Sequence, residues 1–216
     1  MESLQLESTK GNHMMEKMKE KEEELMMNEK LKTGGLNVHP FDEHSSLRNE
    51  VEELYLESFP QSERKPFEMI LNQGKIRKME LYIVTLDDQL AGLAFLIPGE
   101  TIDVLDYLAI SPKLQGQKIG TRMLKWLNEN REHPFVVEIE STLDQPNKQK
   151  ADRKRFYLTN DMIDCGVEFE LFGVKMEMLS AKRRVDFSEY ESTMENYFGR
   201  TLEKHMIRHV RNTERA

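Results

Sequence analysis

Residues 107–124 read YLAISPKLQGQKIGTRML, and in this stretch an apolar strand, a glycine-bearing loop and an amphipathic helix follow one another. A loop that enters a helix N-terminus points several unpaired backbone N–H groups in one direction, and the helix dipole adds about half a positive charge there. Gly116 and Gly120 allow the backbone to approach a ligand closely. The stretch therefore predicts a site for a phosphate or pyrophosphate group that needs no basic side chain.

Hydrophobic patterns on both sides of this stretch predict an α+β domain over residues 36–180. Strands are expected at 36–38, 81–86, 90–97, 102–110, 135–139, 167–172 and 174–179. Helices are expected at about 45–58, after Pro66, at 118–131 and at about 147–160. Asp87-Asp88-Gln89 is expected to form a hairpin turn between two of the strands. The strand, helix, strand order over 102–139 implies a parallel crossover, so the central sheet is expected to be mixed.

Both ends of the chain are expected to extend from this domain. Residues 1–35 carry dense charge before Gly34-Gly35 breaks the pattern, and this segment is either a flexible, solvated helix or a partner-binding helix. Residues 181–216 are expected to form a C-terminal helical extension, with an amphipathic helix at 186–210. This helix is expected to pack on the core, and dimer formation or coverage of the substrate site are the alternatives.

The composition excludes several classes of protein. The chain has 216 residues and a formal net charge of -8, which opposes nonspecific nucleic-acid binding and favours a cationic acceptor. Its single cysteine, Cys165, excludes an internal disulfide and a cysteine-rich zinc site, and the six histidines form no ligand pattern, so no metal is expected. Because the longest apolar run, at 90–98, is too short to cross a membrane and no signal peptide is recognisable, we expect a cytoplasmic protein.

The loop after Ile110 resembles the coenzyme A pyrophosphate loop of the GCN5-related N-acetyltransferases (GNAT), which usually reads Gln/Arg-x-x-Gly-x-Gly/Ala. Gln115 and Gly120 match its first and last positions, whereas Lys118 replaces the middle glycine. Lys118 either takes a positive φ at an energetic cost or keeps helical dihedrals and places a cation near the phosphates. The resemblance implies acetyl-CoA as the co-substrate and a coenzyme site made of Leu108, Ala109, Ile110, Gln115, Gly116, Gln117, Lys118, Ile119, Gly120 and Thr121.

The order of predicted elements over 36–180 is also similar to that of this family. The resemblance implies a three-layer, GNAT-like acyl-CoA N-acyltransferase fold, with a mixed central sheet flanked by helices. In that fold the strands equivalent to 102–110 and 135–140 splay apart, and the pantetheine arm lies between them. Backbone groups near Leu108 and Ile110 would then pair with the arm as an added strand would.

Residues 153–160, RKRFYLTN, resemble the family's Arg-x-x-Phe-Tyr motif, although Asp161-Met162 stands where a Gly-Phe pair is usual. Tyr157 is the expected general acid, because attack of an amine on a thioester expels a thiolate that must receive a proton. A phenol of pKa about 10 can protonate a thiolate whose thiol has a pKa of about 8.5. The alternative is a packed tyrosine without a chemical role.

A carboxylate is expected to assist deprotonation of the acceptor amine, and Glu140 and Asp106 are the two candidates. Regular alternation places Glu138 and Glu140 on one face of their strand. Asp103 and Asp106 share a face only if a bulge separates them. For both candidates the alternative is a solvated strand carboxylate.

The segment ESFPQSERKPF at 57–67 resembles a Phe-Pro-x-x-Glu-Arg-x-Pro-Phe pattern found in some bacterial members of the family. Phe59 and Phe67 are expected to line the acceptor pocket, with packing of both rings into the core as the alternative.

These features predict an acyltransferase that moves an acetyl group from acetyl-CoA directly to a primary amine. The acceptor is expected to be a small molecule or a peptide, without nucleic acid, membrane or metal, and a homodimer is a further expectation. Its identity depends on variable loops that one chain does not decode. The alternatives are a catalytically degenerate sensor that binds acyl-CoA and an interaction protein whose coenzyme site is vestigial.

Overall fold

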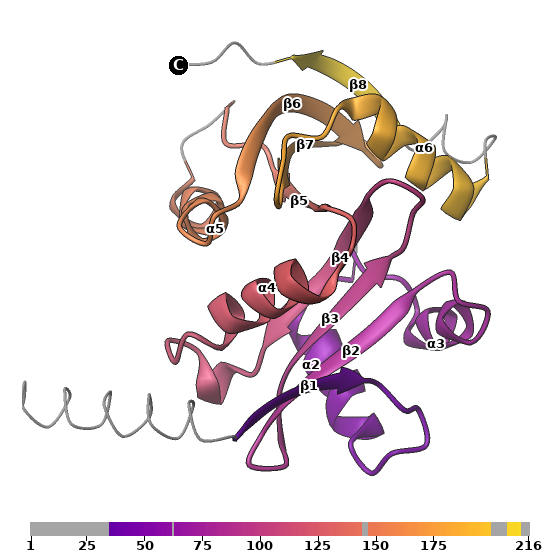
Figure 1. Ribbon diagram of the computed structural model, residues 1–216, viewed down its shortest axis with the longest axis vertical. Helices are drawn as coiled ribbons and strands as arrows, with labels where there is room; N and C mark the ends of the chain where they lie inside the picture. Colours follow the sequence, from indigo (N-terminus) through magenta and orange to yellow (C-terminus); the bar gives the residue numbers. More distant parts are fainter. Residues whose placement is uncertain (1–34, 62, 144–146, 200–206, 213–216) are drawn as a thin grey trace, which may run out of the picture. The chain divides into compact units, whose positions relative to one another are not determined.

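The computed structural model describes residues 35–61, 63–143, 147–199 and 207–212, so the expected extension at 1–35 lies outside the described residues apart from Gly35 (Figure 1). The chain divides into two compact units. In the smaller unit, residues 35–37 and 85–89 are described, and Asp87 N donates a hydrogen bond to Gly35 O over 3.0 Å. Positive φ angles at Asp87 and Asp88 confirm the predicted hairpin turn. The larger unit contains the remaining described residues and all of the candidate site.

The elements predicted between residues 36 and 180 are all present, with ends that differ by a few residues. The strands are β1 (Leu36–Pro40), β2 (Glu80–Leu86), β3 (Gln89–Ile97), β4 (Asp103–Ile110), β5 (Phe135–Glu140), β6 (Ile163–Leu171), β7 (Val174–Ser180) and β8 (Ile207–Asn212). The α-helices are α2 (Arg48–Ser58), α3 (Phe67–Lys75), α4 (Ile119–Asn130), α5 (Lys148–Leu158) and α6 (Phe187–Phe198). None of the helices in the described ranges is long and apolar enough to cross a membrane.

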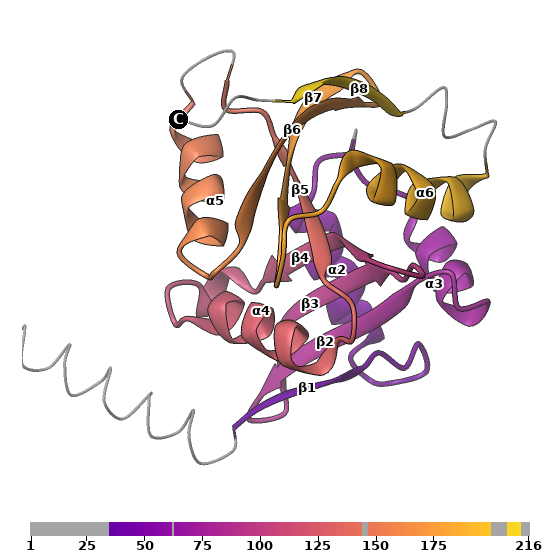
Figure 2. The ribbon, with the colours of Figure 1, turned by 45° about the horizontal axis from the view of Figure 1, so that its top comes forward.

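The strands form one mixed sheet in the order β1-β2-β3-β4-β5-β7-β6-β8. The β4–β5 pair is parallel, as the crossover through α4 predicts, whereas β3–β4, β5–β7, β6–β7 and β6–β8 are antiparallel. Figure 2 shows α4 in front of the β2–β4 strands and α2 behind them. The two helices therefore cover opposite faces of this part of the sheet.

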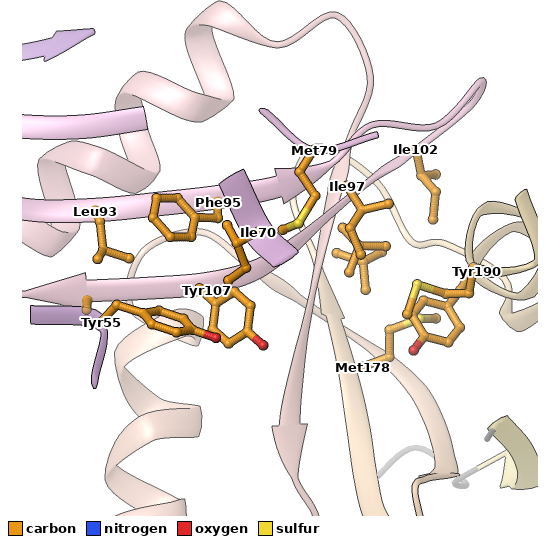
Figure 3. Close-up of a cluster of buried hydrophobic side chains, with 14 of the residues drawn as sticks. Tyr55, Ile70, Met79, Leu93, Phe95, Ile97, Ile102, Tyr107, Met178 and Tyr190 are labelled. Carbon is orange, nitrogen blue, oxygen red and sulfur yellow. The ribbon is translucent and has the colours of Figure 1, made fainter. Parts of the chain in front are cut away.

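A cluster of buried side chains in the larger unit packs α2 and α6 against the sheet. On the α2 side, Tyr55 packs edge to face against Tyr107 of β4, with ring centroids 4.9 Å apart. On the α6 side, Tyr190 is fully buried and lies beside Met178 of β7 (Figure 3). Aromatic pairs of this kind add to the area that the core removes from water.

The C-terminal region differs from its prediction. The helix expected at 186–210 begins with a capping box between Asp186 and Glu189, but it ends at Phe198, where Gly199 has a φ of 86° that few other residues adopt. Residues 207–212 form a strand that pairs with β6, so the expected continuous helix is wrong there. Ile207 is buried, whereas Arg208 is exposed and pairs with Glu170 of β6, as suits a strand at the edge of a sheet.

Candidate active site

The two parallel strands at the centre of the sheet separate soon after they pair. Only Asp103 with Phe135 and Val104 with Val136 are paired between β4 and β5. Beyond these residues β4 keeps its partner β3 on one edge, and β5 keeps its partner β7. We call the part of the two strands beyond Val104 and Val136 the fork. Leu108, Ala109 and Ile110 lie on its β4 side, paired with β3 on their other edge.

A β-bulge lies in β4 at the start of the fork. Tyr107 is opposite Phe95 and Leu105 is opposite Leu96, so Asp106 is the extra residue. The bulge that the alternation argument required is therefore present. The bulge does not bring the side chains of Asp103 and Asp106 together. Asp103, the first residue of β4, is buried and accepts a hydrogen bond from Arg131 Nε over 2.8 Å.

A lysine from the α2–α3 loop binds the bulge. Lys65 Nζ lies 2.5 Å from Asp106 Oδ2, and the two side chains are 18% and 11% exposed. The ammonium also lies 5.2, 5.5 and 5.8 Å from the ring centroids of Tyr107, Tyr197 and Phe198. Burial is the largest single influence and would lower the pKa of Lys65. The attractions of Asp106, Tyr197 and Glu138 together outweigh it, so the net pKa is raised. This lysine is therefore a protonated, firmly held cation.

Glu138 projects from β5 on the other side of the fork. The hydroxyl of Tyr190 on α6 donates a hydrogen bond to Glu138 Oε1. Burial, with a further contribution from the negative charge of Asp106, raises the pKa of Glu138 to about 7. A carboxyl group with this pKa exists in both protonation states near neutral pH, which suits a general base.

Glu140, the β5 carboxylate chosen from sequence, lies two residues further along the strand and has a different environment. Its Oε1 lies 3.4 Å from Lys150 Nζ on α5, and its side chain is 34% exposed. The alternation of β5 indicated that Glu138 and Glu140 share a face, but it contained no sign that the Lys65–Asp106 pair and Tyr190 would surround the first of them.

The predicted phosphate loop enters α4 as the sequence indicated. A short 3₁₀ helix at Pro112–Leu114 precedes Gly116, whose φ is 82°, and Lys118 has a φ of 59°. Lys118 thus takes a left-handed conformation, and the alternative with helical dihedrals is wrong. The first-turn N–H groups at Ile119, Gly120 and Thr121 have no intrahelical acceptor, as at the start of any α-helix. The side chain of the N-cap residue, Lys118, does not cap them.

The two loop glycines have different surroundings. A Cβ atom at Gly116 would meet nothing within 4 Å, whereas one at Gly120 would lie 3.1 Å from Phe156 Cζ. Gly116 therefore leaves space beside the backbone for a ligand, and Gly120 allows α4 to approach α5. Gln115 Nε2 lies 3.5 Å from the carbonyl oxygen of Ile110, and Gln117 Oε1 is buried without a hydrogen-bond partner among the described residues.

Tyr157 lies on α5, half-buried beside Phe156, with ring centroids 5.2 Å apart. Burial raises the pKa of Tyr157 to about 12, and the positive charge of Arg153 partly opposes this. Among the described residues its hydroxyl forms no hydrogen bond. It is therefore a phenol that stays protonated at neutral pH.

The two phenylalanines chosen for the acceptor pocket occupy different places. Phe59 packs edge to face against Tyr107, with centroids 4.9 Å apart, and so lies next to a ring that contacts Lys65. Phe67 is 4% exposed and packs against Tyr55 in the core.

Comparison with known proteins agrees with this geometry. The model of the acetyltransferase (GNAT) family matches residues 46–143. A GNAT-family protein from Bacteroides thetaiotaomicron is similar in structure, with a TM-score of 0.60 and 20% identity over 76% of this chain and 97% of the other. No curated protein sequence matches the chain.

Two further similar structures contain acetyl-CoA. One is a GNAT-family acetyltransferase from Elizabethkingia anophelis, with a TM-score of 0.51 and 15% identity over 69% of this chain and 99% of the other. The second is yncA from Salmonella typhimurium, with a TM-score of 0.52 and 13% identity over 71% of this chain and 95% of the other. The predicted mixed sheet with splayed parallel strands and flanking helices is confirmed as the fold of these proteins. Residues 46–143 are therefore similar in sequence to the GNAT acetyltransferases, and the fold is that of the similar structures.

Proposed function

We propose that this protein transfers an acetyl group from acetyl-CoA to a primary amine of a small molecule or peptide. The pyrophosphate is assigned to the loop at 115–120, where backbone N–H groups at the start of α4 and the open space at Gly116 suit an anion. The pantetheine arm is assigned to the unpaired edge of β4 at Leu108–Ile110. These assignments place the thioester at the fork.

Glu138 is the proposed general base, and its position carries the proposal. It lies at the fork, its pKa is close to neutral, and its Tyr190 hydrogen bond leaves the second carboxylate oxygen to accept a proton from an incoming ammonium. Glu140 and Asp106 are less suitable, because Lys150 and Lys65 hold their carboxylates as ion pairs.

Tyr157 is the proposed general acid. The amine nitrogen forms a bond to the acetyl carbon, the carbon–sulfur bond breaks, and the thiolate takes the phenolic proton. A phenol that remains protonated at neutral pH can perform this step. Phe59 is assigned to the wall of the acceptor site and Phe67 to packing beneath it.

The test is turnover by the full chain with acetyl-CoA and a panel of primary amines that includes alkylamines, polyamines and peptides with free N-termini. The expected result is release of coenzyme A thiol together with an acetylated amine identified by mass spectrometry. Glu138→Gln should lower the rate by about 10²- to 10⁴-fold, whereas the matched variant Glu53→Gln, at an exposed position of α2, should not change it. Binding of acetyl-CoA without any acetylated amine would overturn the proposal in favour of a sensor.

A further inference from the structure

We propose that Lys65 is a positioning residue, which controls the charge of Glu138 by holding the carboxylate of Asp106 in an ion pair. The inference rests on the proposed role of Glu138 as the base. Lys65 lies in the loop between α2 and α3, far from the fork in sequence, and it occupies a variable position of the pattern at 57–67.

The backbone of Lys65 is anchored before its side chain reaches the bulge. Its N–H donates to Tyr107 Oη over 3.2 Å, and its carbonyl oxygen accepts from Tyr55 Oη over 2.9 Å. Both tyrosines are buried in the core. The backbone that carries the ammonium is therefore held in place. The ammonium itself is surrounded by three aromatic rings and Asp106.

Four elements bring groups to the carboxyl of Glu138. Asp106 on β4 and Glu138 on β5 each lie two residues beyond the last paired residues of these strands. The charges of Asp106 and of Lys65, from the α2–α3 loop, act on Glu138. Tyr190 of α6 donates a hydrogen bond to it, and its β7 neighbour, Met178, is apolar. Desolvation and the charge of Asp106 favour the protonated form of Glu138, and the Tyr190 hydrogen bond and the charge of Lys65 favour the ionised form. The charge of Glu138 in turn favours protonation of Lys65, so the two groups interact reciprocally.

Asp106 without its lysine would be a buried, unpaired carboxylate beside a second carboxyl group. Two carboxyl groups in one site cannot both ionise easily, so one of them keeps its proton to a higher pH. A nearby charge of this kind shifts a pKa by about one to three pH units. Lys65 thus keeps Glu138 ionisable near neutral pH, where the acceptor amine must be deprotonated.

The experiment is a carbon-13 NMR titration of the Glu138 carboxyl group in the full chain, which needs neither acetyl-CoA nor turnover. Lys65→Met should raise the titration midpoint of the Glu138 carboxyl group by about one pH unit or more, and Asp106→Asn should lower this midpoint. Lys65→Arg keeps the charge and should keep the midpoint. The control Lys75→Met removes an exposed lysine that pairs with Glu43, and it should have no effect.

The double variant tests whether Lys65 acts through Asp106. In the Asp106→Asn background, Lys65→Met should move the Glu138 midpoint by less than about half as much as in the native background. Equal shifts in the two backgrounds, or an unchanged midpoint in Lys65→Met, would overturn the inference. If Lys65→Met does not fold, an unchanged midpoint in Asp106→Asn would overturn it as well.

Failure of the proposed function gives a different result. If Glu138 is not the base, the NMR midpoints still move as described, but the pH dependence of turnover does not follow them. If the inference alone fails, Glu138→Gln still lowers the turnover rate as expected, while Lys65→Met leaves the titration midpoint of Glu138 unchanged.

Discussion

Glu138→Gln should make the protein much less active and, above neutral pH, more stable. The pKa of Glu138 rises from 4.5 to about 7 on folding. Between these pH values the folded state holds a proton that the unfolded chain has lost, so the free energy of unfolding falls as the pH rises. The loss is complete above about pH 7 and corresponds to roughly 3 kcal/mol. Glutamine is neutral at every pH and still accepts the hydrogen bond from Tyr190, so the variant avoids this loss.

The assay is urea unfolding of the wild type and Glu138→Gln, followed by circular dichroism across the acid to mildly alkaline range. The two proteins should have similar stability near pH 4, and the variant should be more stable by up to about 3 kcal/mol near pH 8. The kcat/KM of the wild type should rise with pH up to about 7 and then level off. A stability difference that does not change with pH would refute the reasoning about Glu138.

Three further variants test other parts of the site. Tyr157→Phe should lower kcat by about 10²-fold or more with little change in stability, because its hydroxyl has no hydrogen bond within the described residues. Arg131→Met should lower the free energy of unfolding by about 3–5 kcal/mol, since Asp103 would be left buried and unpaired. Gly92→Ala should cost about 1–3 kcal/mol, because its Cβ would lie 2.7 Å from the backbone oxygen of Ala109. Steady-state kinetics checks the first variant and urea unfolding the other two.

Each of these three predictions would be contradicted by a specific result. Full activity in Tyr157→Phe would remove the phenol from the mechanism. For Arg131→Met the matched control is Arg155→Met, which removes an exposed pair with Asp152. The control should lower the free energy of unfolding by less than about 1 kcal/mol. Equal losses of stability in the two variants would show that burial of Asp103 has no special role. Unchanged stability in Gly92→Ala would mean that β4 shifts freely against β3.

Local patterns predicted most of the fold. The alternation of β5, the amphipathic face of α4 and the hairpin at Asp87-Asp88 depend on neighbours along the chain, and each is present at the expected place. The C-terminal strand was missed because its partner, β6, lies about 40 residues away in sequence. A helical period in residues 187–198 then extended the predicted helix too far.

The candidate site was only partly predictable for the same reason. The phosphate loop is a single continuous segment, so its glycines and helix start could be identified directly. The charge state of Glu138 depends instead on Asp106, Lys65 and Tyr190, which three separate elements bring to β5. The packing role of Gly120 was also not predictable, because its neighbour Phe156 is distant in sequence. A bulky residue at Gly120 would disturb the packing of α4 on α5 as well as any bound ligand.

The most direct test of the account is calorimetric titration of acetyl-CoA into the full chain, with two matched glycine variants. Gly116 and Gly173 have φ angles of 82° and 81°, and neither has an atom within 4 Å of an added Cβ, so alanine strains both backbones equally. Saturable binding by the wild type and by Gly173→Ala, weakened at least about tenfold in Gly116→Ala, is the predicted result. No binding by the wild type, or equal weakening in both variants, would contradict the assignment of the loop and fork to acetyl-CoA.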